Sequence, residues 1–199
     1  MKLYLIGGLG ADERVFEVLN LNCETKVISW IEPSKDEPID VYVKRLLAQI
    51  NTTKPFGIMG VSFGGLIAIE LSKISNPEIL ILISSVESSD QLKTKFLTLG
   101  KLGLLNLVPT AFIKPPKFLQ SYLFGAKNSK LLNEIIKDTD PRFIRWALKK
   151  MIAWKSAKID VKTLRIHGTK DKLIPLIGEA KEIQNGAHFM IVDLSLIHI

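Results

Sequence analysis

The segment at residues 60–64, which reads Gly-Val-Ser-Phe-Gly, constrains the fold of this chain more than any other. It follows an apolar run and precedes a helical pattern of apolar residues from Leu66 to Ile74. Between a strand and a helix, Gly-x-Ser-x-Gly predicts a tight turn whose serine has a strained backbone. Gly60 and Gly64 would remove side chains that clash across it. Ser62 is therefore the candidate nucleophile, at a helix N-terminus that favours developing negative charge.

Short apolar segments that alternate with helical patterns predict an α/β fold. Such strands indicate a mostly parallel, doubly wound sheet of about six strands with helices on both faces. Helices are expected after Asp12, which can cap one, and over residues 39–50 and 66–74. The expected strands are residues 2–6, 26–30, 56–61, 79–83, 163–167 and 180–184.

Residues 91–158 show no clear strand and only helical stretches broken by prolines, one of which opens at Asp140 and Pro141. They lie within residues 87–160. We expect a helical cap inserted between two parts of one core domain, residues 1–86 and 161–193. Its apolar residues are too many for a solvated linker, so they should pack over the sheet and line an acyl pocket. The alternative is a cap with its own small core. The residues concerned are Leu97, Leu99, Leu102, Leu104, Leu105, Leu107, Phe112, Phe118, Leu119 and Tyr122.

The formal net charge of +7 is concentrated in this segment. Residues 87–160 carry 14 lysines and arginines against 6 acidic residues, and the rest of the chain carries 13 against 14. Such a segment can favour an anionic substrate, an acidic partner or an anionic membrane surface. The simpler interpretation is that these lysines lie on solvated helix faces. No nucleic-acid-binding motif accompanies the charge, so no nucleic-acid partner is expected.

A serine hydroxyl is a weak nucleophile and needs a base, usually a histidine that a carboxylate orients. The chain has three histidines. His188 lies in a glycine-containing loop after the last expected strand and is the candidate base. His167 lies at the end of an expected strand and looks structural, and His198 lies near the end of the chain.

The candidate carboxylate is Asp171, which follows the expected strand at residues 163–167. It would lie at the same sheet edge as Ser62, and it gives the chain order Ser, Asp, His. Glu87, just past the fourth expected strand, is the rival acid. A surface position for Asp171, without any catalytic part, is the other alternative.

The loop at residues 7–10, Gly-Gly-Leu-Gly, can supply donors for an oxyanion. In a doubly wound sheet the first and third strands lie side by side where the strand order reverses. The loop would then lie beside Ser62. The backbone N–H groups of Leu9 and Phe63 could converge on one oxygen and form the oxyanion hole.

On these residues the chain resembles a small α/β-hydrolase. The motifs are the segment 60–64, the segment His-Gly-Thr-Lys-Asp at 167–171 with Pro175, and the segment Gly-Ala-His-Phe at 186–189. Gly7 stands where many members of that family have histidine before the oxyanion glycine.

The resemblance implies a nucleophile at Ser62, an acid at Asp171 and a base at His188, with residues 87–160 as a cap over the pocket. It implies a carboxylesterase-like serine hydrolase that cleaves a small ester-type acyl substrate through an acyl-enzyme, without a cofactor. Thioester, amide, lactone and C–C substrates share this machinery and stay open.

Two other classes compete with this assignment. One is a hydrolase-fold protein that binds without catalysis. The other is a dinucleotide-binding oxidoreductase, because Gly8 and Gly10 follow a strand and Glu32 ends the next. Glu13 stands at the third glycine position of that motif, where a pyrophosphate must approach, which argues against it.

Cys23 is the single cysteine, so no intrachain disulfide forms, and no apolar run approaches the ~20 residues of a membrane span. These features predict a cytoplasmic protein. Residues 194–199 read as a non-native tail that replaces a final helix, and we exclude them from the fold. A genuine short apolar tail is the alternative.

Overall fold

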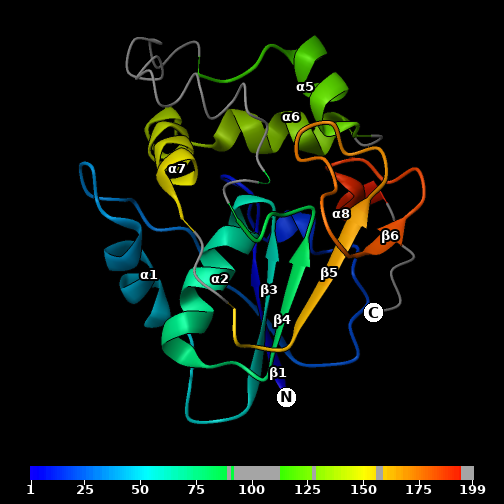
Figure 1. The fold of residues 1–199 in the computed structure, drawn as a ribbon. Coiled ribbons are helices and arrows are strands. Elements are labelled where there is room, and N and C mark those ends of the chain that lie inside the picture. Colours follow the sequence, from blue (N-terminus) through cyan, green and yellow to red (C-terminus); the bar gives the residue numbers. More distant parts are fainter. Residues whose placement is uncertain (89–90, 92–112, 127–128, 156–158, 194–199) are drawn as a thin grey trace.

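The computed structural model describes residues 1–88, 91, 113–126, 129–155 and 159–193. Six strands form one parallel sheet in the order β2-β1-β3-β4-β5-β6 (Figure 1). This is the α/β architecture that the alternation of apolar and helical segments predicts. The strands are β1 (Lys2–Ile6), β2 (Thr25–Val27), β3 (Phe56–Val61), β4 (Ile79–Ile83), β5 (Thr163–Gly168) and β6 (Lys181–Ile183).

Helices cover both faces of the sheet because side chains on each strand alternate between two apolar cores. One core joins Tyr4 and Ile58 to the helices α1 and α2, and the other joins Leu5 and Met59 to α6 and α8. The helical elements are η1 (Glu13–Val15), α1 (Ile39–Leu47), α2 (Phe63–Ser75), α5 (Lys117–Phe124), α6 (Ser129–Asp138), α7 (Pro141–Ala153) and α8 (Met190–Asp193).

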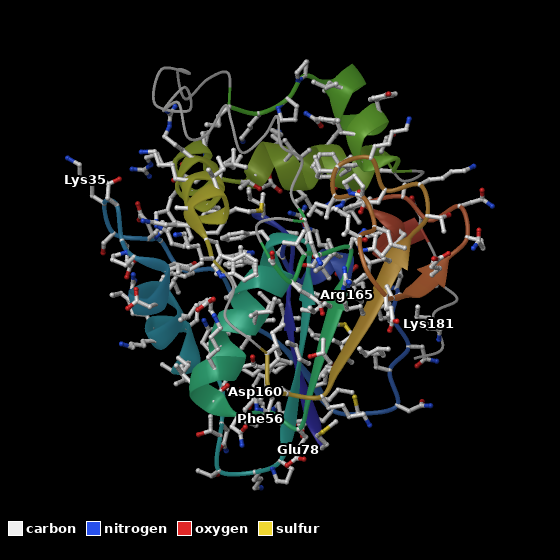
Figure 2. The ribbon with its side chains drawn as sticks, in the orientation of Figure 1. Lys35, Phe56, Glu78, Asp160, Arg165 and Lys181 are labelled. Carbon is white, nitrogen blue, oxygen red and sulfur yellow. The ribbon has the colours of Figure 1, made fainter. Side chains whose placement is uncertain are left out.

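The strand order reverses between β1 and β3, where Ile6 pairs with Gly60. The loops that leave these two strands therefore start next to each other. Helices α5, α6 and α7 lie over this end of the sheet (Figure 1). Phe56 and Glu78 mark the opposite end, where β3 and β4 begin (Figure 2).

Helix α7 joins the layer above the sheet to the core below. Phe143 and Trp146 pack edge-to-face against Phe63 at the start of α2, with ring centroids 6.5 and 6.2 Å away. The indole N–H of Trp146 also donates to the carbonyl of Glu37 over 2.9 Å. Among the described residues, no helix combines the length and the apolar character that a bilayer crossing requires.

Two expected elements are shorter than predicted. The edge strand β2 ends at Val27 instead of residue 30, because the side-chain amide of Gln49 pairs with both backbone groups of Ser29. The helix expected after Asp12 is the single 3-10 turn η1. The Asp12 carboxylate accepts from the backbone N–H of Arg14, as a cap does, but it is also held by the Arg14 guanidinium.

Several predictions fall outside the described residues. They are the tail at residues 194–199 with His198, and the predicted pocket-lining residues between Leu97 and Phe112; the side chain of Phe118 is also not described. The division into a core and a cap at residues 87–160 stays a prediction.

Candidate active site

Ser62 lies in a sharp turn between β3 and α2. Its backbone has φ 53° and ψ −121°, in the left-handed φ region that residues with a side chain rarely adopt. A Cβ on Gly60 would lie 2.6 Å from the Cα of Gly65, and one on Gly64 would collide with the carbonyl oxygen of Gly7. The turn therefore requires Gly60, as the sequence predicts, whereas Gly64 is required by the close approach of the backbone of Ile6 and Gly7 and not by a contact across the turn.

Ser62, His188 and Asp171 form a continuous chain of hydrogen bonds. Ser62 Oγ lies 2.9 Å from His188 Nε2, and His188 Nδ1 lies 2.8 Å from Asp171 Oδ2. An ionised carboxylate can only accept, so Nδ1 carries a proton and donates it to Asp171. Nε2 of the neutral ring is then free to accept the hydroxyl proton of Ser62.

The Asp171 side chain is completely buried. Its second oxygen, Oδ1, accepts the backbone N–H groups of Leu173 and Ile174 over 3.0 and 2.8 Å. Burial pushes the pKa of Asp171 up, but the charge of His188, hydrogen bonds from His167 and His188, and the Ile174 N–H together lower it to about 2. The carboxylate is therefore ionised at neutral pH.

Two loops that dock on each other bring together Asp171 and His188, which are 17 positions apart in the sequence. The N–H of Lys170 donates to the carbonyl of Gly186 over 2.8 Å, and the N–H of Asn185 donates to Thr169 Oγ1 over 2.9 Å. A side chain on Gly168 would overlap the Gly186 carbonyl, so glycine is needed for this close approach. This loop contact, which follows the short strand β6, brings the acid and the base together in space although few residues separate them in the sequence.

The other acid and base candidates lie elsewhere or have other partners. Glu87, the rival acid, pairs with Arg165 of β5 at 3.2 Å (Figure 2 labels Arg165), whereas the acid bonded to His188 is Asp171. His167 is buried at the end of β5, as expected for a structural histidine, but its Nε2 also lies 3.4 Å from Asp171 Oδ2. No pattern in the sequence predicts this contact.

The loop at residues 7–10 lies against the turn that carries Ser62. A Cβ on Gly8 would lie 3.6 Å from the Cβ of Ser62. Among the described residues, the N–H groups of Leu9 and Phe63 make no backbone hydrogen bond outside the regular helices and strands. Trp30 holds this loop from outside, because its indole N–H donates to the carbonyl of Ala11 over 2.9 Å.

A cavity of about 350 Å³ is lined by Ser62, His188, Leu9 and Phe63. Aliphatic and aromatic side chains of the upper helices form its wall: Leu123 and Phe124 of α5, Leu132, Ile135 and Ile136 of α6, and Ile144, Leu148 and Met151 of α7. Lys172 also lines the cavity, and its Nζ lies 3.8 Å from the ring centre of Tyr122. The walls favour an apolar ligand group.

The composition of this wall differs from the prediction. Tyr122 was expected in the lining, but it is 60% exposed and does not contribute to the cavity wall. The next two residues, Leu123 and Phe124, line the cavity instead. The Phe124 carbonyl accepts the N–H of Phe189, which fixes the rotation of α5 relative to the loop of His188.

The basic side chains of α7 face a second cleft, of about 550 Å³, that also contains Trp30 and Trp146. Acidic residues line the same cleft, and the charges pair across it. Arg142 lies 2.9 Å from Asp140 and 3.5 Å from Glu32. The charge of this helix is therefore partly neutralised by carboxylates, outside the cavity beside Ser62.

The described residues offer little to a metal or a dinucleotide. No three His, Cys, Asp or Glu side chains among them gather closely enough to hold a metal ion. The loop with Gly8 and Gly10 leads into the short turn η1 rather than a long helix, so the helix N-terminus that binds a pyrophosphate is missing there. Glu32 pairs with Arg142 in the second cleft.

The sequence matches no family model and no curated protein. The structure, in contrast, is similar to several solved ones. A lipase-esterase related protein from Clostridium acetobutylicum superposes with a TM-score of 0.71 at 15% identity, over 98% of this chain and 89% of that one. A thermophilic esterase from Thermogutta terrifontis gives 0.69 at 14% identity, over 95% and 83%. The chain has the α/β-hydrolase fold.

A third similar structure is an N-acyl homoserine lactonase complexed with N-butanoyl homoserine, with a TM-score of 0.67 at 14% identity, over 94% of this chain and 81% of that one. In this chain Ser62 lies in the turn after β3, Asp171 in the loop after β5 and His188 in the loop after β6. At these identities the likeness concerns the fold.

Proposed function

We propose that this protein is a serine hydrolase that cleaves a small ester-type acyl substrate through an acyl-enzyme. The observation that carries the proposal is the hydrogen-bonded chain from Ser62 through His188 to Asp171, at the edge of an apolar cavity. The names of the similar structures, which include esterases and a lactonase, support the same reaction class.

In the first half of the reaction, Ser62 Oγ attacks the substrate carbonyl carbon while His188 Nε2 takes the hydroxyl proton. The imidazolium that forms is stabilised by Asp171, whose low pKa keeps it an acceptor. The carbonyl oxygen becomes negative and accepts the N–H groups of Leu9 and Phe63, helped by the N-terminus of α2. His188 then gives its Nε2 proton to the leaving alcohol, and the acyl group stays on Ser62.

In the second half, water replaces the alcohol. His188 Nε2 accepts a water proton as the water oxygen attacks the acyl carbon, and the same two N–H groups hold the second oxyanion. Collapse of this intermediate returns the proton from His188 to Ser62 Oγ and releases the carboxylic acid. Each proton thus moves between His188 and an oxygen atom, and no cofactor takes part.

The residues above the sheet act as a cap that selects the acyl group. The cavity beside Ser62 is lined by Leu132, Ile135 and Leu148, so an alkyl chain attached to the substrate carbonyl would be transferred from water to an apolar environment. Each methylene that is buried contributes about 0.8 kcal/mol, which is about fourfold in kcat/KM if it is realised in the transition state. Turnover should therefore rise with acyl length until the cavity is full.

The test is hydrolysis of p-nitrophenyl esters from acetyl to decanoyl by the wild type, Ser62→Ala and Ser75→Ala. Ser75 is a matched control because it lies on the same helix and its hydroxyl donates to the carbonyl of Leu71. We expect activity in the wild type and the control and none in Ser62→Ala. Unchanged hydrolysis in Ser62→Ala contradicts the assignment.

A wild type without activity on any ester, thioester or lactone, and without labelling by a fluorophosphonate, would favour the alternative of a binding protein. Binding of a fluorescent fatty acid to such a protein would then be measured, with Leu148→Trp as the cavity variant. A rise in activity with acyl length supports the cap as a specificity element. A flat profile would contradict that part of the proposal only.

A further inference from the structure

The Asp171 carboxylate is surrounded by four donors. Oδ1 accepts the N–H groups of Leu173 and Ile174, and Oδ2 faces His188 Nδ1 at 2.8 Å and His167 Nε2 at 3.4 Å. Three of these groups are hydrogen-bonded to the carboxylate, and His167 Nε2 lies beside a remaining acceptor position of Oδ2. The first three belong to the loop and to the base. The fourth comes from a strand and has no part in the mechanism so far.

The proton of His167 is located by its neighbours. Nε2 lies 2.8 Å from the carbonyl oxygen of Ile174, and a carbonyl can only accept. The ionised carboxylate of Asp171 can only accept as well. The proton is therefore on Nε2 and is donated to the carbonyl of Ile174, and Asp171 Oδ2 is a second, longer contact of the same N–H at 3.4 Å.

The strand fixes His167 more firmly than a loop would. It lies in the penultimate position of β5, opposite Glu182 of β6, and its side chain is 2% exposed. The segment from Asp171 to Ile174 folds back over this ring, so the ring ties both ends of the segment to the sheet.

We propose that His167 is a positioning residue for the catalytic acid: it holds Asp171 Oδ2 toward His188 and weakens the basicity of that oxygen. The inference rests on the proposed function, in which Asp171 orients and stabilises His188. It assigns a second histidine to the site without giving it contact with the substrate.

The electrostatic consequence has a definite sign. A donor on Oδ2 draws electron density from the oxygen that stabilises the His188 imidazolium. Without that donor, Asp171 attracts the His188 proton more strongly, so the pKa of His188 rises. The other groups facing His188 are Ser62, the ring edge of Phe124 and, in the same cavity, the ammonium of Lys172. None of them is altered by a change at His167.

Two substitutions distinguish the effect of losing the N–H donor from the effect of changing the side-chain volume. His167→Gln keeps an amide N–H2 at about the reach of Nε2, and His167→Phe keeps a planar ring without a donor. Should the phenylalanine variant fail to fold, His167→Asn, whose amide is too short to reach Asp171, takes its place. Ser72→Ala is the matched control, because it removes another buried bond to a backbone carbonyl, that of Ile69, far from Asp171.

The first readout is the pKa of His188, followed by NMR of the imidazole C–H groups in the full chain, with His188→Asn to assign its signal. We expect an increase of about 0.5 unit in His167→Phe or His167→Asn, which is about threefold in proton affinity. His167→Gln and Ser72→Ala should keep the wild-type value. This readout needs no turnover, so it decides on His167 even if the proposed ester hydrolysis fails.

The second readout is kcat/KM against pH, per active site titrated with a fluorophosphonate. The acid limb should move to higher pH together with the pKa of His188. In the variant without a donor, kcat on the plateau should fall about tenfold, because Asp171 Oδ2 is no longer held toward His188. His167→Gln should recover both values. If His167 had a purely structural role, its variants would show lower thermal stability and fewer active sites, while the pKa of His188 and the acid limb of kcat/KM would stay unchanged. That result in the donor-free variant overturns the proposal.

Discussion

Gly60→Ala tests the turn that carries Ser62. The new methyl carbon would lie 2.6 Å from both the carbonyl carbon of Gly64 and the Cα of Gly65, and would collide with the Gly64 oxygen. All of these atoms belong to the backbone at the start of α2, so no side-chain rotation can relieve the contact. Either the turn opens or the helix moves away from β3, and both displace Ser62 from His188.

Gly57→Ala on the same strand is the matched comparison. Its methyl carbon would lie 2.9 Å from Ile79 Cγ2 and 3.0 Å from Leu3 Cδ1, which belong to side chains, and the nearest backbone atom is the Ile79 oxygen at 3.4 Å. Overpacking a core costs typically ~1–3 kcal/mol. We place Gly57→Ala at roughly 1 kcal/mol and Gly60→Ala at roughly 3 kcal/mol or above, because only Gly60→Ala brings the methyl carbon closer than 3 Å to backbone atoms.

The assay is urea unfolding at neutral pH, followed by tryptophan fluorescence, together with fluorophosphonate titration of the folded protein. Gly57→Ala should keep full labelling with a modest loss in the free energy of unfolding. Gly60→Ala should lose both stability and labelling. Equal free energies of unfolding for the two variants, or full labelling of Gly60→Ala, would refute the account of the turn.

Three further predictions address the site and its support. The Asp171 pKa, lowered from 3.8 to about 2 mainly by His188 and His167 against the opposing effect of burial, makes the carboxylate stabilising above about pH 4. That contribution to the free energy of unfolding, roughly 2 kcal/mol, is lost as the pH falls through about 2, so the acid unfolding curve of Asp171→Asn should lack this loss. Parallel acid unfolding curves for the wild type and Asp171→Asn would contradict this prediction. The same substitution should lower kcat by about 10⁴. Leu148→Trp narrows the cavity and should lower kcat/KM for long-chain esters by about fourfold for each methylene that no longer fits, with acetyl esters unaffected; an equal loss for all esters would indicate a folding defect. Trp146→Phe leaves the buried Glu37 carbonyl without its donor and should lower the free energy of unfolding by about 1–2 kcal/mol, measured by urea titration; an unchanged value would show that another group pairs with this carbonyl.

The sequence predicts the elements whose requirements are local. The glycine at position 60 is needed by the turn itself, and the apolar strands β1, β3, β4 and β5 have nearly the expected bounds. Asp171 and His188 could be chosen because each follows a strand in the expected chain order. Their contact could not be derived, since it depends on the docking of the Lys170 and Gly186 backbones.

Features that depend on packing were predicted less well. The apolar positions of α5 do not define its rotation, which is set by the contact of its last residue with the loop of His188, so Phe124 rather than Tyr122 lines the cavity. The early end of β2 depends on Gln49, twenty residues further along the chain. The approach of His167 to Asp171 likewise needs the folded segment between them.

The most direct test of the central claim is to trap the acyl-enzyme equivalent on its serine. The wild type, Ser62→Ala and His188→Asn are incubated with a fluorophosphonate and digested, and the modified peptide is sequenced by mass spectrometry. The proposed mechanism predicts one adduct, on Ser62, formed by the wild type, much more slowly by His188→Asn and not by Ser62→Ala. An unlabelled wild type, or an adduct on any other residue that persists in Ser62→Ala, would contradict it.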